Sequence, residues 1–404
     1  MILDSSISAQ MVQHVIHISM DGLRPDAITA LGTNDVPNFY RFRREGAFTD
    51  NARTDPDWAV TLPNHACQLT GRPVGGLAGH NWTQNQDPSK GETLESNKGF
   101  YIAGVFDVAH DNGKRTGLFA SKSKFSLFAT SWDVDHGCPD LIPLDYGKNK
   151  IDAFVIEADT QLMLTLFGSE MAAQPFDYVF LHFADPDFAG HTFGWDVTPG
   201  SPYLQVVKAM DARLGTVFEI IETNSFLAGR TMVLLTVDHG GSGMDHSNPE
   251  AYENFTIPFY VWGPGTASGA DLYAINRTTR ADPGTNRPLN DASVQPIRNG
   301  DIANLGLRLL GLPPVPGSCI NASQELMVSY DPRPELRITL VGTNLVLNFR
   351  TQTNVMYDLE VTDDLGSKQW MKSMVNLSGT GVETNINVGS AAALGRFYRC
   401  SVRY

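Results

Sequence analysis

The chain has 404 residues, of which 42% are hydrophobic and 18% are charged, which is enough globular material for one large domain and a small one. Its formal net charge of -14 argues against broad binding to a nucleic-acid backbone, which requires a basic surface, but not against a nucleotide as a small substrate. No apolar stretch is long enough to span a membrane, and the four widely spaced cysteines include no Cys-x-x-Cys pair, which argues against zinc-finger or thioredoxin-type sites and leaves room for one or two disulfides.

The amino-terminal part of the chain predicts a strand, a helix and a loop. Met1–Gln13 lacks a basic stretch followed by an apolar core, so an export signal either never existed or has been removed. Residues 15–20 form an apolar run that predicts a buried strand ending on Asp21. A helix is predicted over 36–46, and it is followed by an extended segment and a loop at 54–58.

A short helix is predicted from Thr61 to Gly71. Thr61 suits the N-cap, Pro63 suits the first turn, and Gly71 suits the C-terminal stop. This assignment places Thr61 at the amino end of the helix, where free backbone N–H groups and the helix dipole favour anions.

Helices and strands alternate through the rest of the large domain. The other predicted helices cover residues 100–112, 151–167, 203–223 and 299–310. The other predicted strands cover residues 115–120, 178–183, 231–237 and 257–263. This alternation predicts an α/β fold with a mainly parallel sheet sandwiched by helices. Residues 266–296, rich in Gly, Asn, Asp, Thr and Pro, are expected to form an irregular surface excursion.

From about Leu336 the pattern changes to short alternating segments separated by turns. That pattern predicts a small C-terminal all-β sandwich module. We therefore expect a catalytic domain over residues 1–332 and a β module over 333–404. The β module contains no histidine, so we expect it to be a structural or adhesive appendage.

Carboxylates follow three of the predicted buried strands. Asp21 follows the first strand, Asp187 follows the strand at 178–183, and Asp238 follows the strand at 231–237. Because the carboxyl ends of parallel strands meet at one edge of a sheet, these side chains are expected to be neighbours. Carboxylates clustered in a low-dielectric crevice repel one another unless a cation binds among them. The alternative for each stretch is a turn with ordinary polar residues.

Histidines near these carboxylates extend the pattern to two metal sites. Asp187 and His191 are spaced for one face of a helical turn, and His246 is a candidate third ligand. A second set consists of Asp21, Asp238 and His239. Imidazole and carboxylate ligands together suit zinc, and two such ions can clamp the attacking and leaving oxygens of a displacement at phosphorus.

Thr61 is the candidate nucleophile for such a displacement. A hydroxyl bound to a metal at a helix amino terminus can lose its proton near neutral pH and attack. The alternative is that Thr61 serves only as a helix cap.

Five short motifs, taken together and in this order, resemble the alkaline phosphatase superfamily over residues 14–315. The most similar branch is the nucleotide pyrophosphatase/phosphodiesterase type. The motifs are Asp21-Gly-Leu-Arg-Pro-Asp26, Thr61-Leu-Pro-Asn-His65, Leu69-Thr-Gly71, Pro186-Asp187-x-x-Gly190-His191 and Asp238-His239-Gly240.

The resemblance implies an alkaline phosphatase-like fold, two Zn²⁺ ions and a covalent phospho-threonine intermediate on Thr61 that water then hydrolyses. It implies one zinc held by Asp187, His191 and His246. It implies the other zinc held by Asp21, Thr61, Asp238 and His239. A loop asparagine of the family binds a non-bridging phosphoryl oxygen, and Asn81 is the best match in this chain, in a loop one residue shorter than the family pattern.

Two comparisons within the superfamily refine the expected substrate. Nucleotide-cleaving members carry their last zinc-binding histidine much later, whereas no histidine follows His246 here, which weakens the case for nucleotide specificity. Sulfatases share the fold but use a modified Cys or Ser where this chain has Thr61.

Lys122 and Lys124 follow a predicted strand and either add positive charge at the phosphate or form a solvated pair. His65 is expected to be a helix-packing residue or a residue that supports the metal ligands from behind them.

We therefore expect a zinc-dependent hydrolase of phosphate esters, most simply of phosphodiesters, with a small phosphorylated substrate as its partner. Hydrolysis of phosphomonoesters or phosphonates is the nearest alternative, because the same two ions serve all three substrates. A non-catalytic metal- or sugar-binding protein is the alternative from another class. The habits of the resembling enzymes suggest a periplasmic or secreted protein.

Overall fold

The computed structural model describes residues 12–329, 336–351, 356–366, 369–390 and 395–403. The chain divides into two compact units, Met1–Val328 and Ser329–Tyr404. The expected boundary between residues 332 and 333 lies outside the described residues, as do residues 1–11 of the amino-terminal segment considered above. Among the described helices, none has the length and apolar character that crossing a bilayer requires.

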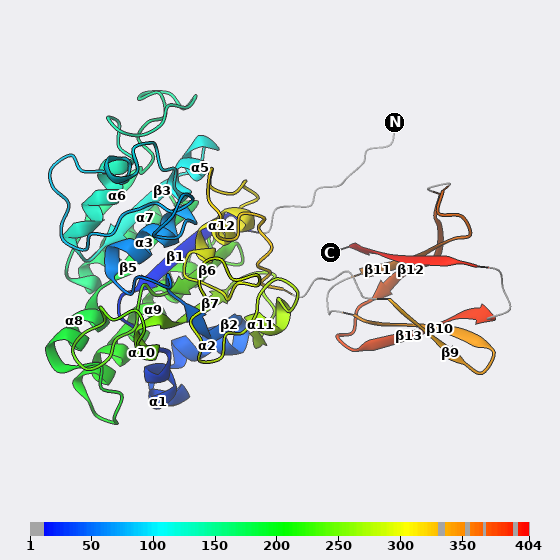
Figure 1. Ribbon diagram of the computed structural model, residues 1–404. Coiled ribbons are helices and arrows are strands. Elements are labelled where there is room, and N and C mark those ends of the chain that lie inside the picture. The colour runs from blue at the N-terminus through cyan, green and yellow to red at the C-terminus, as the bar shows by residue number, and fades with distance from the viewer. Residues whose placement is uncertain (1–11, 330–335, 352–355, 367–368, 391–394, 404) are drawn as a thin grey trace. The chain divides into compact units, whose positions relative to one another are not determined.

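The first unit is built on an eight-stranded, mostly parallel sheet with helices on its faces (Figure 1), which confirms the predicted α/β class. The strand order is β4-β3-β5-β1-β6-β7-β2-β8. The strands of the parallel part are β1 (His14–Met20), β3 (Thr116–Ala120), β4 (Ala153–Ile156), β5 (Tyr178–Phe183) and β6 (Thr231–Thr236). Beyond β6, β7 (Thr256–Trp262) is antiparallel to both of its neighbours, β6 and β2 (Ala47–Arg53), and β8 (Ala270–Asp271) pairs with β2.

The register of the central strands fixes the position of the site. In β1, Met20 pairs with Phe183 of β5, and Ser19 pairs with Thr236 of β6. Every residue of these three strands is buried, as expected for apolar strands covered on both faces. The residues that follow the three strands therefore emerge together at one edge of the sheet.

Helices on the two faces of the sheet include one long helix and several short ones. Those of the first half are α1 (Pro25–Asp35), α2 (Pro37–Glu45), α3 (Thr61–Thr70), α4 (Leu94–Lys98), α5 (Val105–Asp111) and α6 (Ser126–Ser131), which follows the 3-10 turn η1 (Ser123–Phe125). Those of the second half are α7 (Thr160–Ala173), α8 (Asp185–Phe193), α9 (Pro202–Thr223), α10 (Tyr252–Phe255), α11 (Leu272–Ile275) and α12 (Asp301–Leu309).

Two predicted helices begin later than expected. The helix predicted over 151–167 is wrong in its first part, because residues 153–156 pair with β3 as edge strand β4. The following helix, α7, begins only at Thr160, where the Asp159 side chain accepts hydrogen bonds from two backbone N–H groups. The helix predicted over 100–112 begins at Val105, after Gly104, whose N–H donates to the Asp107 carboxylate.

The second unit contains two three-stranded antiparallel sheets, in agreement with the predicted all-β module. Their orders are β13-β10-β9 and β12-β11-β14. The strands are β9 (Arg337–Val341), β10 (Asn344–Arg350), β11 (Met356–Thr362), β12 (Met371–Ser378), β13 (Glu383–Ser390) and β14 (Phe397–Arg403). Residues of β10, β11 and β13 share one small hydrophobic core. The sequence did not predict β12, whose side chains are mostly exposed.

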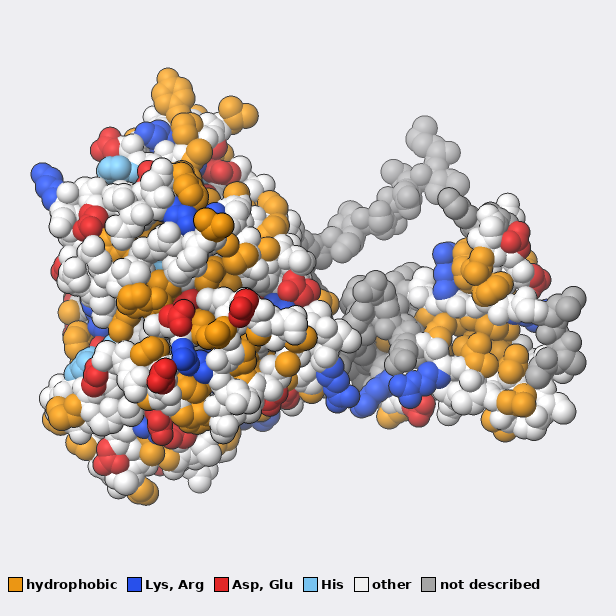
Figure 2. Space-filling view, viewed as in Figure 1, with side chains coloured by type: hydrophobic (Ala, Val, Ile, Leu, Met, Phe, Trp, Pro, Cys, Tyr) orange, Lys and Arg blue, Asp and Glu red, His pale blue; other side chains and the backbone are white. Residues whose placement is uncertain are grey.

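The first unit carries charges of both signs on the face shown in Figure 2. On the face of the first unit that Figure 2 shows, the acidic and basic side chains of the described residues are interspersed without a broad basic patch. All four cysteines are free thiols, so the disulfides for which the sequence left room are absent.

Candidate metal centre

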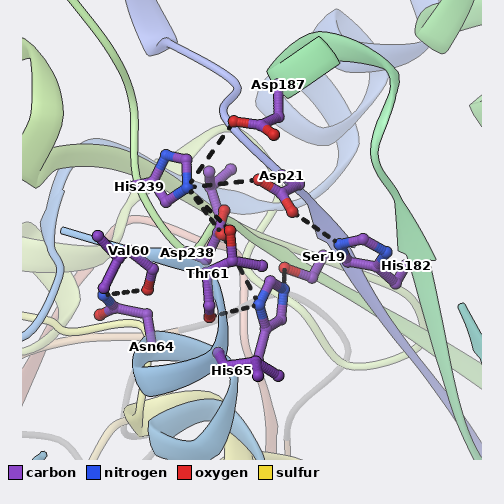
Figure 3. Close-up of polar contacts among 12 residues, drawn as sticks. Ser19, Asp21, Val60, Thr61, Asn64, His65, His182, Asp187, Asp238 and His239 are labelled. Carbon is purple, nitrogen blue, oxygen red and sulfur yellow. Dashed lines mark hydrogen bonds and ion pairs between the residues drawn. The ribbon is translucent and has the colours of Figure 1, made fainter. Parts of the chain in front are cut away.

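Three carboxylates converge where β1, β5 and β6 end (Figure 3). Asp21 follows β1, Asp238 lies two residues after β6, and Asp187 lies in the first turn of α8, which starts directly after β5. All three side chains are buried. Because Asp187 is on a helix, His191 is placed one turn further along the same helix, with its Nε2 3.4 Å from Asp187 Oδ1.

The ligand atoms form two groups that share one histidine. The first group is Asp187, His239 and His246, and the second is Asp21, Asp238 and His239, with the ligand atoms of each group within 4.8 Å of one another. His191 adjoins the first group, since its ring centroid lies 5.0 Å from that of His246. The structure therefore brings together all six carboxylate and imidazole groups of the two predicted sets, with His239 between the two positions.

Unsatisfied carboxylate oxygens show that this cluster suits cations. Asp21 Oδ1, Asp187 Oδ1 and Asp238 Oδ2 are buried and accept no hydrogen bond from any described residue. A buried carboxylate oxygen without a donor is costly, and a bound metal ion removes that cost. The donor set of carboxylates and imidazoles fits a divalent transition metal such as zinc.

The histidines are held in the tautomer that a metal ligand needs. Nδ1 of His239 donates to the carbonyl of Gly240 at 2.8 Å, and Nδ1 of His246 donates to the carbonyl of Ala59 at 2.7 Å. Nδ1 of His191 donates to the Met244 carbonyl at 3.1 Å. A carbonyl only accepts, so the proton is on Nδ1 and the lone pair of Nε2 faces the cluster.

Electrostatics favour neutral histidines in this cluster. Burial lowers the pKa of His239 to about 4 and that of His246 to about 3, so both rings are uncharged at neutral pH. Burial also raises the pKa of Asp238 well above its ordinary value, and the neighbouring Asp21 adds to the shift. The pKa of Asp21 moves the other way: burial opposes ionisation, but Lys122 and His182 outweigh it.

The Thr61 hydroxyl lies beside the cluster and does not cap its helix. The prediction that Thr61 is the N-cap of α3 is wrong: Val60 has the extended cap conformation, and Thr61 is the first helical residue. Its Oγ1 is 3.4 Å from Nε2 of His239. The hydroxyl is therefore available for another role. At the other end of α3, the helix stops at Gly71 as predicted, and Gly71 has a left-handed φ of 63°.

A buried layer under the cluster holds these groups in place. His182 donates from Nε2 to Asp21 Oδ2 at 3.0 Å. His65, predicted to be a helix-packing residue or a support behind the metal ligands, is completely buried. Its Nδ1 donates to the Thr61 carbonyl at 2.8 Å, and its Nε2 lies 2.9 Å from Ser19 Oγ. His65 thus ties the start of α3 to β1.

The cluster opens into a cavity of about 530 Å³. Its polar lining includes Thr61, Asn85, Lys122, Lys124, Asp187 and His191. The Asn85 side-chain oxygen accepts from the Leu62 N–H at 3.0 Å and from Lys124. Asn85 was missed in the sequence, where it is one of several amides in a polar loop with no spacing that distinguishes it.

The structure does not bring Asn81 to this cavity. The Asn81 amide nitrogen donates within its own loop, to the carbonyls of Gly76 and Val74, and the residue has a positive φ of 60°. Neighbouring His80 is buried and lies 3.1 Å from the Pro63 carbonyl, so it supports the same loop.

The alternative that Lys122 and Lys124 form a solvated pair is wrong, because both line the cavity and the Lys122 side chain is only 9% exposed.

A comparison with protein-family models found a match. The model of a family described as type I phosphodiesterase / nucleotide pyrophosphatase matches residues 15–275, more than half of the chain. No curated protein matches the sequence.

Solved structures show the same fold. An inactive threonine-to-alanine variant of murine ectonucleotide pyrophosphatase / phosphodiesterase 5, in complex with AMP, has a TM-score of 0.52 and 13% identity over 78% of this chain and 99% of that one. The human protein of the same name gives 0.52 and 14%, over 78% and 100%. A 2-O GAG sulfatase gives 0.52 and 11%, over 93% and 85%.

Proposed function

Because the chain belongs to the type I phosphodiesterase / nucleotide pyrophosphatase family, we propose that it is a two-zinc hydrolase that cleaves phosphodiesters through a covalent intermediate on Thr61. The observation that carries this proposal is the position of the Thr61 hydroxyl beside buried carboxylate oxygens that lack hydrogen-bond donors. The inactive form of the murine neighbour, a threonine-to-alanine variant in complex with AMP, also supports a threonine nucleophile and a small phosphorylated substrate.

The proposed ligands divide into two sets. Asp187, His191 and His246 would hold one zinc, and Asp21, Thr61, Asp238 and His239 would hold the other. When bound, the two ions supply Lewis-acid stabilisation of the negative charge that develops on the attacking, leaving and non-bridging oxygens. Figure 3 shows the Thr61, Asp21, Asp187, Asp238 and His239 side chains directed toward one another.

The chain's own residues then carry out a two-step displacement. The Thr61 hydroxyl loses its proton, Thr61 Oγ forms a bond to phosphorus, and the ester oxygen leaves with the bonding electrons and takes up a proton. Water next attacks the phosphothreonine, the Thr61 Oγ–phosphorus bond breaks, and the hydroxyl is restored. Throughout, His65 holds the first turn of α3 through the Thr61 carbonyl.

We assign to Asn85 the binding of a non-bridging phosphoryl oxygen, the role that the resemblance implied for Asn81. The Asn85 side-chain oxygen is engaged by the Leu62 N–H and by Lys124, which leaves the amide nitrogen as the group that donates to a phosphoryl oxygen. We expect Asn85→Ala to lower kcat by about 10²-fold, the usual effect of removing one such donor. Asn81→Ala is the matched control and should change kcat little. Equal losses in the two variants would refute this role for Asn85.

The cavity lining favours a diester. Ile156 and Phe188 provide an apolar wall beside Thr61, suited to a second substituent on phosphorus. Lys124, which lines the same cavity, favours the alternative, a phosphomonoester or a phosphonate, because its ammonium group can pair with an additional negative charge.

A substrate panel distinguishes these alternatives. The rates of hydrolysis of a nitrophenyl phosphodiester, a nitrophenyl phosphomonoester and a nitrophenyl phosphonate would be compared, with and without a zinc chelator. We expect the diester to have the highest kcat/KM and the chelator to abolish its hydrolysis, with activity restored by added zinc. A faster monoester or phosphonate would reassign the substrate class, and the absence of chelator-sensitive turnover of all three would refute the proposed function.

Export to the periplasm or the cell exterior is proposed on the same basis. The C-terminal β module and the habits of the resembling enzymes support it. Cell fractionation of the full-length protein tests this localisation.

A further inference from the structure

Lys122 lies within the acidic cluster rather than at its edge. Its Nζ is 2.6 Å from Asp21 Oδ2 and 2.7 Å from Asp187 Oδ2. These two carboxylates belong to different ligand groups. Lys122 comes directly before η1, at the end of β3, so the sheet positions it at the same edge as the carboxylates.

The contacts of Lys122 divide the oxygens of each carboxylate. Oδ2 of Asp21 accepts from Lys122 and His182, whereas Oδ1 of Asp21 has no hydrogen-bond partner among the described residues. Asp187 repeats the pattern, since Lys122 binds its Oδ2 and leaves its Oδ1 without a donor. In both carboxylates the oxygen that Lys122 does not bind faces a histidine of the two proposed ligand sets: Asp21 Oδ1 lies 3.4 Å from Nε2 of His239, and Asp187 Oδ1 lies 3.4 Å from Nε2 of His191.

We propose that Lys122 is a positioning residue that restricts Asp21 and Asp187 to ligation through one oxygen each. This inference rests on the proposed two-metal function. A carboxylate that offers one oxygen suits four-coordinate zinc, whereas calcium takes six to eight oxygens and often uses both oxygens of a carboxylate. Lys122 thus favours zinc over larger cations. It also supplies positive charge to three buried carboxylates when metal is absent.

The chain offers a matched control two residues away. Lys124 lines the same cavity, but its Nζ donates to the backbone and side-chain oxygens of Asn85 and not to a carboxylate of the cluster. Lys122→Met and Lys124→Met each remove one positive charge from the lining of the same cavity. Only the first variant leaves the Oδ2 atoms of Asp21 and Asp187 without their lysine.

The test measures metal binding and unfolding in the full-length chain. Zinc and calcium affinities would be determined by competition with chromophoric chelators, and thermal unfolding would be followed with and without zinc. We expect Lys122→Met to reduce the preference for zinc over calcium by about tenfold, the lower end of the effect of residues that orient metal ligands. We also expect the midpoint of thermal unfolding of Lys122→Met to be lower than that of wild type in the metal-free protein and to recover largely with zinc. Lys124→Met should match wild type in both measurements.

The outcomes separate this inference from the proposed function. Wild-type protein that binds no zinc would refute the two-zinc function. Wild-type protein that binds zinc, together with a Lys122→Met variant of unchanged metal preference, would refute the role of Lys122 alone. If Lys122→Met folds only with zinc, the inference is supported. If it does not fold in either condition, Lys122→Gln, which keeps an N–H donor, replaces it, and an unchanged metal preference in that variant would refute the inference.

Discussion

Replacing Thr61 with alanine should abolish turnover while leaving zinc bound. We expect kcat to fall by at least about 10³-fold, because loss of a nucleophile removes the covalent route and leaves only what binding and charge stabilisation provide. Zinc content should stay near two per chain, since Asp21, Asp238 and His239 remain to hold the ion that Thr61 would also contact. Steady-state kinetics and elemental analysis of the same preparation provide both readouts.

Thr61→Ser is the matched control for this variant. It keeps a hydroxyl at the first position of α3 and should retain measurable turnover. A Thr61→Ala enzyme with a near-normal rate would contradict the mechanism and would show that Thr61 is only a helix residue. Zinc loss in Thr61→Ala would instead assign the threonine a larger part in metal binding than we propose.

Replacing His239 with alanine should have the second large effect, because its Nε2 faces all three carboxylates of the cluster. Its Nε2 lies 3.1 Å from Asp238 Oδ2, 3.4 Å from Asp21 Oδ1 and 4.0 Å from Asp187 Oδ1. Loss of this imidazole should weaken binding of the zinc that His239 is proposed to hold with Asp21, Thr61 and Asp238, and lower kcat/KM by at least about 10²-fold, the upper end of the loss caused by changing residues that merely orient metal ligands. Zinc titration monitored by calorimetry measures the binding.

His191→Ala is the comparison for His239→Ala. The His191 side chain is 43% exposed and adjoins only the first group, so its loss should weaken one zinc and leave the second in place. A His239→Ala variant that keeps both ions at wild-type affinity would refute the assignment of His239 as a zinc ligand.

The convergence of the acidic groups could be anticipated because it follows from strand order and register. A buried apolar run predicts a strand whose carboxyl end lies at the ligand-binding edge, and Asp21 and Asp238 need no further information to be placed there. Asp187 and His191 follow from helical spacing. These positions can be predicted because local patterns identify the strands and the helical turn, and parallel strands place the residues that follow them at one edge of the sheet.

The remaining features depend on contacts that no local pattern encodes. Asn85 reaches the cavity because its loop folds against the start of α3, whereas Asn81, four residues earlier, folds back on its own loop. A lysine between polar residues is normally exposed to solvent, yet the side chain of Lys122 is largely buried, because its ammonium group pairs with two carboxylates, Asp21 after β1 and Asp187 in α8. Strand β4 was mistaken for helix because it is a short, half-exposed edge strand directly before a capped helix.

Crystals grown with zinc and measured at the zinc absorption edge test the two-metal assignment most directly. We predict two anomalous peaks, one contacting Asp187 Oδ1 and Nε2 of His246, and the other contacting Asp21 Oδ1 and Asp238 Oδ2. Peaks found only elsewhere in the molecule, or none at all, would contradict the assignment and leave Thr61 without the ions on which its proposed reactivity depends.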